Sequence, residues 1–380
     1  MRDGPGVRRS RFKLRRSPHL VVYWRHDALH IHNYATQQTI NATPFVVDVL
    51  NLCARWRLPA DVSNAFPDQP AALVSTLLDR LVALSILERS DRPQDPRSAA
   101  MNRLGEWQPE MGFFHTATRD VSFTDRRVVR RRFRARSARL PMPSPVKTYP
   151  RVKSVVLPNP SAIGQFPDVL MARRTWRRFS STPIDAQELA TMLALTAGVQ
   201  QWVDADGHRA ALKTSPSGGA RHSIETYVVV REVKGVRPGI YHYACDRHAL
   251  DRLGGAVPVD RIRAYMPTSP YFAKASAIVF FTSIFERILW RYPYSRAYRA
   301  ALAEAGHVCQ TFCLTATWLG LAPFCLMGLA DSLIEADLGL DGITEAVLYA
   351  AGVGRPPRGS SWAALPTGKN PKVINNKRLR

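Results

Sequence analysis

Residues 173–179 read Arg-Arg-Thr-Trp-Arg-Arg-Phe, and this short stretch carries the strongest chemical signal in the chain. Arg173, Arg174 and Arg177 place three guanidinium groups around the hydroxyl of Thr175. Guanidinium groups bind phosphate oxygens in a bidentate manner, and a hydroxyl between them adds a neutral hydrogen bond. The stretch therefore predicts a phosphate-binding site, with a charged helix start at a domain edge as the alternative.

A second informative stretch, residues 213–222, reads Lys-Thr-Ser-Pro-Ser-Gly-Gly-Ala-Arg-His. Pro216 restricts the chain, Ser217 offers a donor, and the Gly218-Gly219 pair lets backbone approach a flat ligand closely. Binding of a flavin or a nucleotide requires such an approach. The sequence has no GxGxxG and no GxxxxGK[ST] motif, so Rossmann and P-loop explanations lose support.

Composition limits the class of protein. The chain has 380 residues, 46% of them hydrophobic, which predicts two domains with cores of their own. Its formal net charge of +23 comes mostly from Arg, concentrated at residues 8–16 and 126–139. Such charge would suit nucleic acid or an anionic membrane surface, but charge runs alone are weak signals. We therefore favour solvated basic segments over nucleic-acid binding.

The cysteines predict neither a disulfide framework nor a metal site. They are odd in number and show no CxxC spacing: Cys53, Cys245, Cys309, Cys313 and Cys325. The pair Cys309 and Cys313 lies one turn apart in an apolar helical stretch, and we interpret both as small hydrophobic residues. The sequence has no 18-residue apolar run and no apolar segment after its basic start. These features predict a cytoplasmic protein without a membrane span.

Changes in composition and in hydrophobic pattern divide the chain into five parts. We expect a basic tail over 1–17, a small winged-helix-like domain over 18–92, an Arg- and Pro-rich linker over 93–164, an α+β domain over 165–358 and a tail over 359–380. A winged-helix-like domain can bind DNA, or it can bind a peptide by adding it as a strand to an exposed edge. Both readings stay open for residues 18–92.

Hydrophobic periodicity predicts the main helices and strands. Thr43 ahead of Pro44 is a reasonable helix start. The predicted strands are 20–23, 29–33, 86–89, 225–230, 239–243, 277–281 and 345–350, and the predicted helices are 44–52, 70–84, 185–197 and 298–319.

Further motifs follow the first two in order along residues 165–357. They are Pro238-Gly-Ile-Tyr-His-Tyr, Trp290-Arg-Tyr-x-x-x-Arg-x-Tyr-Arg, Gly306-His-Val-x-Gln, Leu319-Gly-Leu, Leu338-Gly-Leu-Asp-Gly-x-x-Glu and Ala351-Gly-Val-Gly-Arg-Pro. The ordered set resembles the nitroreductase superfamily, and most closely its SagB-type branch. That branch includes the azoline dehydrogenases that form thiazoles and oxazoles in ribosomal peptides. Phe113-Phe-His-x-Ala-Thr-Arg resembles a linker motif of the same branch.

The resemblance implies a nitroreductase-like FMN-binding fold, a central mixed sheet flanked by helices, built as a homodimer with each flavin between two subunits. It assigns the FMN phosphate and ribityl chain to the 173–177 stretch and the isoalloxazine ring to the Ser-Gly-Gly turn. It also places the segment Pro323–Gly328 near the flavin N5 edge. The implied cofactor-binding residues are Arg173, Arg174, Thr175, Arg177, Pro216, Ser217, Gly218, Gly219, Gly328 and Arg355.

The chain departs from this branch at one position that bears on catalysis. A neighbouring Lys-Tyr pair is expected to serve proton transfer in the azoline dehydrogenases, and here the position reads Arg291-Tyr292. Because Arg keeps its charge, it cannot act as a general base, which weighs against azoline oxidation. Tyr292 stays a candidate acid or base that Arg291 polarises, and Lys213 is a further candidate. Ordinary aromatic packing is the alternative for Tyr292.

These observations together predict an FMN-dependent oxidoreductase that transfers hydride between flavin N5 and a peptide-linked or peptide-derived substrate, such as an azoline. One alternative is an NAD(P)H-dependent nitro- or ene-reductase that acts on small molecules. The other is a non-catalytic protein that binds a peptide or nucleic acid through its N-terminal domain.

Overall fold

The computed structural model describes residues 12–105, 108–120, 126–140, 164–205 and 208–359. The chain divides into two compact units. The N-terminal unit comprises Met1–Arg119 together with Leu289–Tyr298, and the C-terminal unit comprises Asp120–Ile288 together with Arg299–Arg380. A short segment from the second half of the sequence therefore belongs to the N-terminal unit.

The N-terminal unit contains an antiparallel meander of three strands, a two-stranded sheet and three helices before residue 90. The meander has the order β2-β3-β4, and β1 pairs antiparallel with β5. These elements are β1 (Leu14–Arg16), β2 (Leu20–Arg25), β3 (Ala28–Asn33), β4 (Gln38–Ala42), α1 (Pro44–Leu52), α2 (Pro59–Asn64), α3 (Ala71–Ala83) and β5 (Leu87–Arg89).

The core of this unit forms where the apolar stripes of α1 and α3 meet the sheets. Val49, Leu78 and Ile86 are buried there together with Ile31 of β3. The predicted start of α1 is confirmed, because Thr43 is extended at the N-cap and proline occupies the first helical turn. The burial of three to four apolar residues every two turns explains why these short helices are stable only as part of the domain.

The structure corrects the predicted tail and linker. Strand β1 lies inside the predicted tail and pairs with β5. The predicted linker begins with two helices, α4 (Pro96–Leu104) and α5 (Pro109–Thr118). Helix α4 starts because the Asp95 carboxylate accepts hydrogen bonds from the backbone N–H groups of residues 97 and 98, at 2.9 and 3.1 Å. This Asp-Pro cap is a helix signal that the Arg- and Pro-rich composition conceals.

The C-terminal unit is built around one six-stranded sheet of order β12-β11-β9-β13-β15-β14. Every pairing in it is antiparallel, so the predicted mixed sheet is wrong in this respect. The connections between β9, β11 and β12 are too short for the crossovers that parallel pairs need. The strands are β9 (Ile224–Val230), β11 (Gly239–Ala244), β12 (Ala249–Gly254), β13 (Ala277–Ile284), β14 (Ala322–Leu326) and β15 (Glu345–Gly354).

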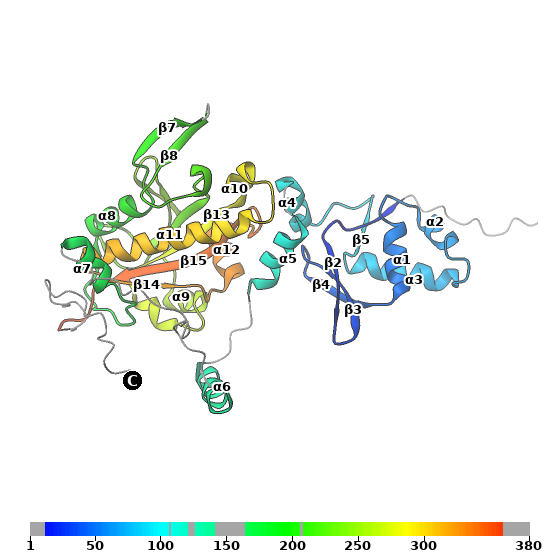
Figure 1. The fold of residues 1–380 in the computed structure, drawn as a ribbon, viewed down its shortest axis with the longest axis horizontal. Helices are drawn as coiled ribbons and strands as arrows, with labels where there is room; N and C mark the ends of the chain where they lie inside the picture. The colour runs from blue at the N-terminus through cyan, green and yellow to red at the C-terminus, as the bar shows by residue number, and fades with distance from the viewer. Residues whose placement is uncertain (1–11, 106–107, 121–125, 141–163, 206–207, 360–380) are drawn as a thin grey trace, which may run out of the picture. The chain divides into compact units, whose positions relative to one another are not determined.

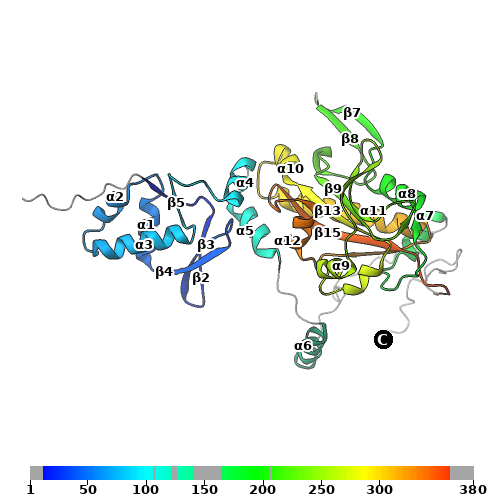
Figure 2. The same ribbon diagram turned by 180° about the vertical axis from the view of Figure 1, so that it is seen from behind.

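Helices cover both faces of this sheet, which confirms the predicted α+β fold. On one face lies the long helix α11 (Ala297–Trp318), whose Phe312 ring is 6.2 Å from that of Phe281 on β13. On the other face, Phe280 packs in one core with α9 (Val259–Tyr265) and α12 (Asp331–Leu338). Figures 1 and 2 show α11 in front of the sheet from one side and behind it from the other.

The remaining elements lie around this core or outside it. Strands β6 and β10 form a short parallel pair, and β7 and β8 form a hairpin. They are β6 (Ile184–Asp185), β7 (Gln201–Ala205), β8 (His208–Leu212), β10 (Val233–Lys234), α6 (Arg126–Arg139), α7 (Gln165–Ala172), α8 (Ala186–Ala197) and α10 (Phe285–Arg291).

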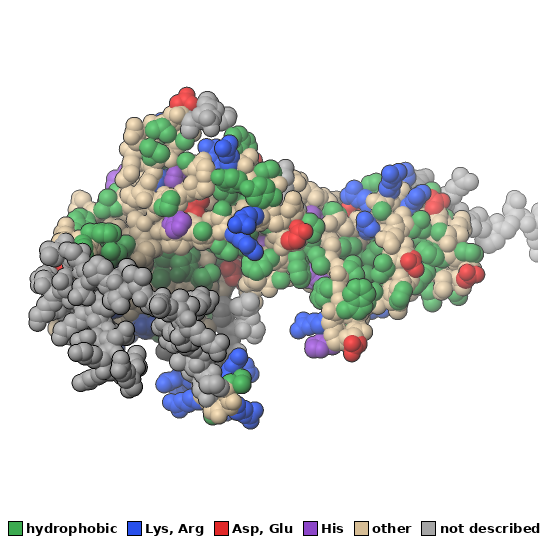
Figure 3. Space-filling view, in the orientation of Figure 1, with side chains coloured by type: hydrophobic (Ala, Val, Ile, Leu, Met, Phe, Trp, Pro, Cys, Tyr) green, Lys and Arg blue, Asp and Glu red, His purple; other side chains and the backbone are tan. Residues whose placement is uncertain are grey.

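The basic run at residues 126–139 forms helix α6, and its described arginines are mostly exposed. Figure 3 shows their side chains gathered around this helix. The other basic run, residues 8–16, lies partly outside the described residues. In the described part of the chain, no helix combines the length and the apolar character needed to cross a membrane.

Candidate functional site

The arginine-rich stretch of residues 173–180 runs beside the end strands of the large sheet. The backbone N–H of Trp176 donates to the carbonyl oxygen of Pro323 at 2.9 Å, which fixes the stretch at the start of β14. Four residues later, the N–H of Ser180 donates to the carbonyl oxygen of Arg355 at 2.9 Å. The stretch is therefore held in an extended form by two strands that are neighbours in the sheet.

Three arginines of this stretch, Arg173, Arg174 and Arg177, have no carboxylate partner among the described residues. Arg177 is exposed, whereas the other two and Thr175 are half-buried. Arg174 uses one guanidinium nitrogen to cap two backbone carbonyls, at 2.7 and 2.8 Å. Guanidinium groups without a carboxylate partner among the described residues, next to Thr175 in sequence, suit an anionic group such as a phosphate.

Arg355, the other predicted phosphate ligand, is largely engaged elsewhere. Its Nε donates to the carbonyl oxygen of Pro183 at 3.0 Å, and its Nη2 donates to Glu188 Oε2 at 2.8 Å. Glu188 also completes the capping box at the start of α8 together with Asp185. Arg355 thus anchors this helix, and its Nη1 is the guanidinium nitrogen that keeps no partner among the described residues.

The Ser-Gly-Gly turn is shaped by one left-handed glycine. Gly219 has a φ of +60°, a conformation that costs little for glycine and more for any other residue. Ser217 Oγ accepts a hydrogen bond from the N–H of His222 at 2.8 Å and thereby closes the turn. Gly218 and Pro216 complete the predicted turn at its N-terminal side.

Helix α11 holds this turn through a buried carboxylate that the sequence motifs do not mark. Glu304 is only 3% exposed. It accepts hydrogen bonds from Ser217 Oγ at 3.0 Å, Ser223 Oγ at 3.1 Å and the N–H of Ile224 at 3.4 Å. Burial raises the pKa of Glu304. An acidic residue on the apolar side of a predicted helix, close to the Gly306-His-Val motif, is the signal that could have revealed it.

Two further contacts extend the attachment of the turn to α11. The carbonyl oxygen of Pro216 lies 3.3 Å from His307 Nδ1, and Ser215 Oγ lies 2.7 Å from Thr311 Oγ1. The turn and the stretch 173–180 therefore have different supports, α11 for one and β14 for the other. Among the described residues, no hydrogen bond joins the two.

Lys213 precedes the turn and is half-buried, like its neighbours Cys245 and His222. Its Nζ is 3.5 Å from Cys245 Sγ. Burial, reinforced by the positive charge of Lys213, lowers the pKa of His222 to about 4. The His222 ring is held by the carbonyl oxygen of Ala211 at 2.9 Å, and Arg287 donates to the His222 carbonyl oxygen at 3.0 Å.

A charged network that contacts His222 through Arg287 was not predicted from the sequence. Glu225 on β9 contacts His242 on β11 at 2.7 Å and also forms an ion pair with Arg287. The hydrogen bond that His242 donates to Glu225 raises the pKa of His242. Burial alone would raise the pKa of Glu225, but the contacts with His242 and Arg287 lower it on balance. Arg287 thus links the charged pair on the sheet to His222, which lies at the end of the turn.

The other predicted catalytic residues, Arg291 and Tyr292, fall in the N-terminal unit. Helix α10 ends at Arg291, which is exposed, whereas Tyr292 is half-buried. The carbonyl oxygen of Tyr292 accepts from the N–H of Tyr294 at 2.7 Å, and the two rings are 6.1 Å apart. Aromatic packing therefore accounts for part of this motif, as the alternative interpretation predicts.

The segment that contains Arg291 and Tyr292 is held by α5. His115 Nδ1 lies 2.9 Å from the hydroxyl of Tyr298, and Ser295 Oγ donates to Gln108 Oε1 at 2.8 Å. His115 comes from the Phe113-Phe-His motif and Tyr298 from the Trp290-Arg-Tyr motif. Two motifs that lie 183 residues apart in sequence therefore meet in one unit.

Comparison with known proteins gives a family match, related sequences and similar structures. A model of the nitroreductase family matches residues 170–355. The Methanocaldococcus jannaschii protein named "Putative nitroreductase MJ1384" is 34% identical over 154 residues, which are 40% of this chain and 74% of that protein. The trifolitoxin-processing protein TfxB of Rhizobium leguminosarum bv. trifolii is 34% identical over 144 residues, which are 36% of this chain and 38% of TfxB.

Among solved structures, the Escherichia coli microcin synthetase McbBCD complex with truncated pro-MccB17 contains a chain with 20% sequence identity. The match covers 70% of this chain and 100% of that chain, with a TM-score of 0.48.

Proposed function

The chain belongs to the nitroreductase family, and on this premise we propose that it is an FMN-dependent oxidoreductase of the SagB type that acts on a peptide-linked or peptide-derived substrate. The observation that carries the proposal is the likeness to the trifolitoxin-processing protein, because its name joins a relative of this chain to the processing of a toxin. Since the chain spans little more than a third of that relative's length, its substrate is part of the proposal.

The described residues fit a flavin mononucleotide. Arg173, Arg174 and Arg177, which form no ion pair among the described residues, would hold the phosphate together with the Thr175 hydroxyl. The left-handed turn at Gly219 offers backbone without side chains to a flat ring. Pro216, Ser217 and Gly218 would share this role, while Gly328 and the free nitrogen of Arg355 would complete the cofactor site. Bound FMN supplies hydride transfer at its N5 position.

We propose that two such chains form a homodimer that completes the cofactor site. The 173–180 stretch and the Ser-Gly-Gly turn have separate supports in one chain, which is the arrangement expected if each serves a different flavin of a symmetric pair. Sedimentation of the flavin-loaded protein should give the mass of two chains. A monomer that keeps its flavin on dilution would contradict the dimer.

The proton transfer that accompanies hydride transfer would be the task of the protein side chains. The phenol of Tyr292 would hold or deliver this proton, and Arg291 would orient a substrate carbonyl, because its charge is permanent. Lys213 is the alternative proton carrier, since it is half-buried and precedes the Ser-Gly-Gly turn in the chain. Arg291 in place of Lys favours reduction, or oxidation of a substrate other than an azoline.

The N-terminal unit would recognise the peptide. The order β2-β3-β4 leaves β2 at the edge of its sheet, and this strand exposes two large apolar side chains, Val22 (45%) and Trp24 (74%). Figure 3 shows apolar side chains at the surface near the tip of the β2–β3 hairpin. A peptide added as a further strand would pair with the β2 backbone and cover these side chains.

The experiment that tests the proposal is anaerobic reaction of the flavin-loaded protein with two partners. We expect a dehydrated peptide to reoxidise dithionite-reduced flavin in a single turnover, and azoline peptides or NAD(P)H alone to reduce the oxidised flavin only slowly. Replacement of Trp24 by Ser should raise the peptide concentration needed and leave the limiting rate unchanged. A protein that ignores peptides at every concentration would contradict the proposal.

A second candidate is an NAD(P)H-dependent nitro- or ene-reductase, which the likeness to the Methanocaldococcus jannaschii protein favours. It predicts rapid bleaching of the flavin by NAD(P)H and turnover with small nitro compounds. The W24S variant would then behave like the unaltered protein.

A further inference from the structure

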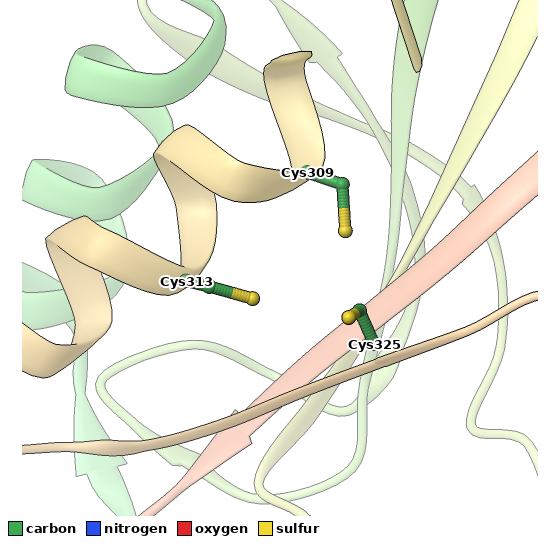
Figure 4. Close-up of side chains that lie close together, drawn as sticks. All are labelled: Cys309, Cys313 and Cys325. Carbon is green, nitrogen blue, oxygen red and sulfur yellow. The ribbon is translucent and has the colours of Figure 1, made fainter. Parts of the chain in front are cut away.

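Three cysteines that form no CxxC motif in the sequence lie close together in the C-terminal unit. Cys309 and Cys313 lie one turn apart on α11, and Cys325 lies on β14. Their three sulfur atoms are all within 4.8 Å of one another. Figure 4 shows the three thiols pointing toward a common centre. The sequence interpretation of Cys309 and Cys313 as small apolar residues explains their burial but not this convergence.

The separations suit one metal ion. A zinc–thiolate bond is about 2.3 Å long, so sulfur atoms around a shared ion lie about 3.8 Å apart in a tetrahedral site and about 4.0 Å apart in a trigonal one. Both values lie within the observed limit of 4.8 Å, so the separations of the sulfur atoms are compatible with one shared ion. The positions on α11 give two ligands from one helix face, since residues four apart are neighbours there.

The chemistry of the donor set selects the kind of ion. Thiolate ligands prefer soft, thiophilic ions such as Zn²⁺ and Cu⁺, and they bind Mg²⁺ and Ca²⁺ poorly. Among the described residues, no His, Asp or Glu joins the three cysteines, so a fourth position would stay open. Open positions are typical of zinc sites that bind a substrate or water, and three thiolates alone satisfy Cu⁺.

The burial of the three free cysteines is compatible with a bound ion. Cys309 and Cys313 are buried, and Cys325 is half-buried, so an ion could enter from the side of β14. The hydroxyl of Tyr349 lies 3.6 Å from Cys325 Sγ and provides a second contact for this sulfur. Such outer contacts orient a ligand toward a metal.

We propose that Cys309, Cys313 and Cys325 form a three-thiolate site for a thiophilic metal ion, Zn²⁺ or Cu⁺. This proposal rests on the positions of three sulfur atoms and not on flavin binding, so it does not depend on the proposed function. The remaining cysteines, Cys53 and Cys245, lie outside the group.

The test uses the full-length chain, purified with reductant and without chelators or nickel resin. We expect about one bound zinc or copper ion per chain by elemental analysis. Titration of the metal-free protein with Zn²⁺ against a chromophoric chelator, and separately with Cu⁺, identifies the preferred ion. Cobalt substitution should give thiolate-to-metal charge-transfer absorption. Cys325→Ser should weaken binding at least about tenfold, while the matched control Cys245→Ser should bind as the unaltered chain does.

Alkylation of the unaltered chain gives a measurement that does not depend on a variant's folding. Zinc or Cu⁺ should protect the three cysteines from alkylation, as read by mass spectrometry of peptides, and leave Cys245 unprotected. Equal labelling of Cys325 with and without each metal would overturn the proposal. So would a disulfide among the three in the reduced preparation, or equal metal affinity of the Cys325→Ser and Cys245→Ser variants.

Discussion

Replacement of Glu304 by Ala should loosen the Ser-Gly-Gly turn and weaken the binding of FMN. The buried carboxylate accepts two good hydrogen bonds, from Ser217 at 3.0 Å and Ser223 at 3.1 Å, and one longer bond of 3.4 Å. Hydrogen bonds to a charged group contribute about 1.5–3 kcal/mol each, so the two good bonds imply a loss of about 3 kcal/mol in the free energy of unfolding. The longer bond adds little.

Part of this loss should appear in the affinity for FMN. If the turn that Ser217 holds becomes disordered in the free protein, ordering it again on binding costs about 1.4 kcal/mol, which is about tenfold in Kd. Flavin fluorescence quenching gives Kd, and urea unfolding gives the stability. Glu304→Gln keeps one acceptor and should fall between the two proteins.

Glu335 offers a matched control for this change. It is 2% exposed, lies on α12 and accepts a hydrogen bond from the N–H of Val347 at 3.1 Å, on the opposite side of the sheet from α11. Glu335→Ala should lose stability without any change in Kd. A Glu304→Ala protein that loses stability but binds FMN as tightly as the unaltered chain would show that the turn is not part of the cofactor site. Equal losses of affinity in both variants would point to a general effect of stability.

Three other changes test separate parts of the account. Gly219→Ala forces a side chain into the left-handed region and should destabilise the fold by about 1–2 kcal/mol in urea unfolding; an equally stable variant would refute the turn geometry. Arg291→Lys supplies a group that can lose its proton, so the rate with an azoline peptide should rise with pH, and Tyr292→Phe should slow the reaction in both backgrounds. An unchanged rate in Tyr292→Phe assigns the residue to packing. The pKa of His242 is raised by its hydrogen bond with Glu225, so its stabilisation is complete below the ordinary histidine value and is lost as pH rises through the folded value. The stability advantage over His242→Gln should therefore shrink as pH rises above the ordinary histidine value of about 6.5, and an advantage that grows with pH would contradict this assignment.

Local patterns in the sequence predict much of the fold because they report on burial. The β-branched run of β9 and the long apolar helix α11 appear where periodicity places them. Pairing direction is not local: nothing in the residues of β9 alone shows that both neighbours run antiparallel to it, and the expected mixed sheet is wrong for this reason. Composition was misleading at α4, where the Asp95-Pro cap starts a helix inside a region rich in Arg and Pro.

In the candidate site, too, local features could be predicted from the sequence and tertiary contacts could not. Sequence motifs predict the arginine stretch and the Ser-Gly-Gly turn, because clustered arginines and paired glycines are recognisable in a sequence. The residues that hold these two segments in place are not recognisable in this way. Glu304 and Cys325 come from a helix and a strand whose contacts are set by tertiary packing, and neither residue lies at a recognisable spacing from its partners. The N-terminal placement of Arg291 and Tyr292 likewise follows from contacts with α5 and not from sequence order.

An absorbance spectrum of the purified chain, recorded before and after heat releases any bound cofactor, tests the central claim most directly. The account predicts a yellow protein that releases about one FMN per chain, and a metal-independent flavin spectrum. A colourless protein whose spectrum and melting temperature do not respond to added FMN would contradict it.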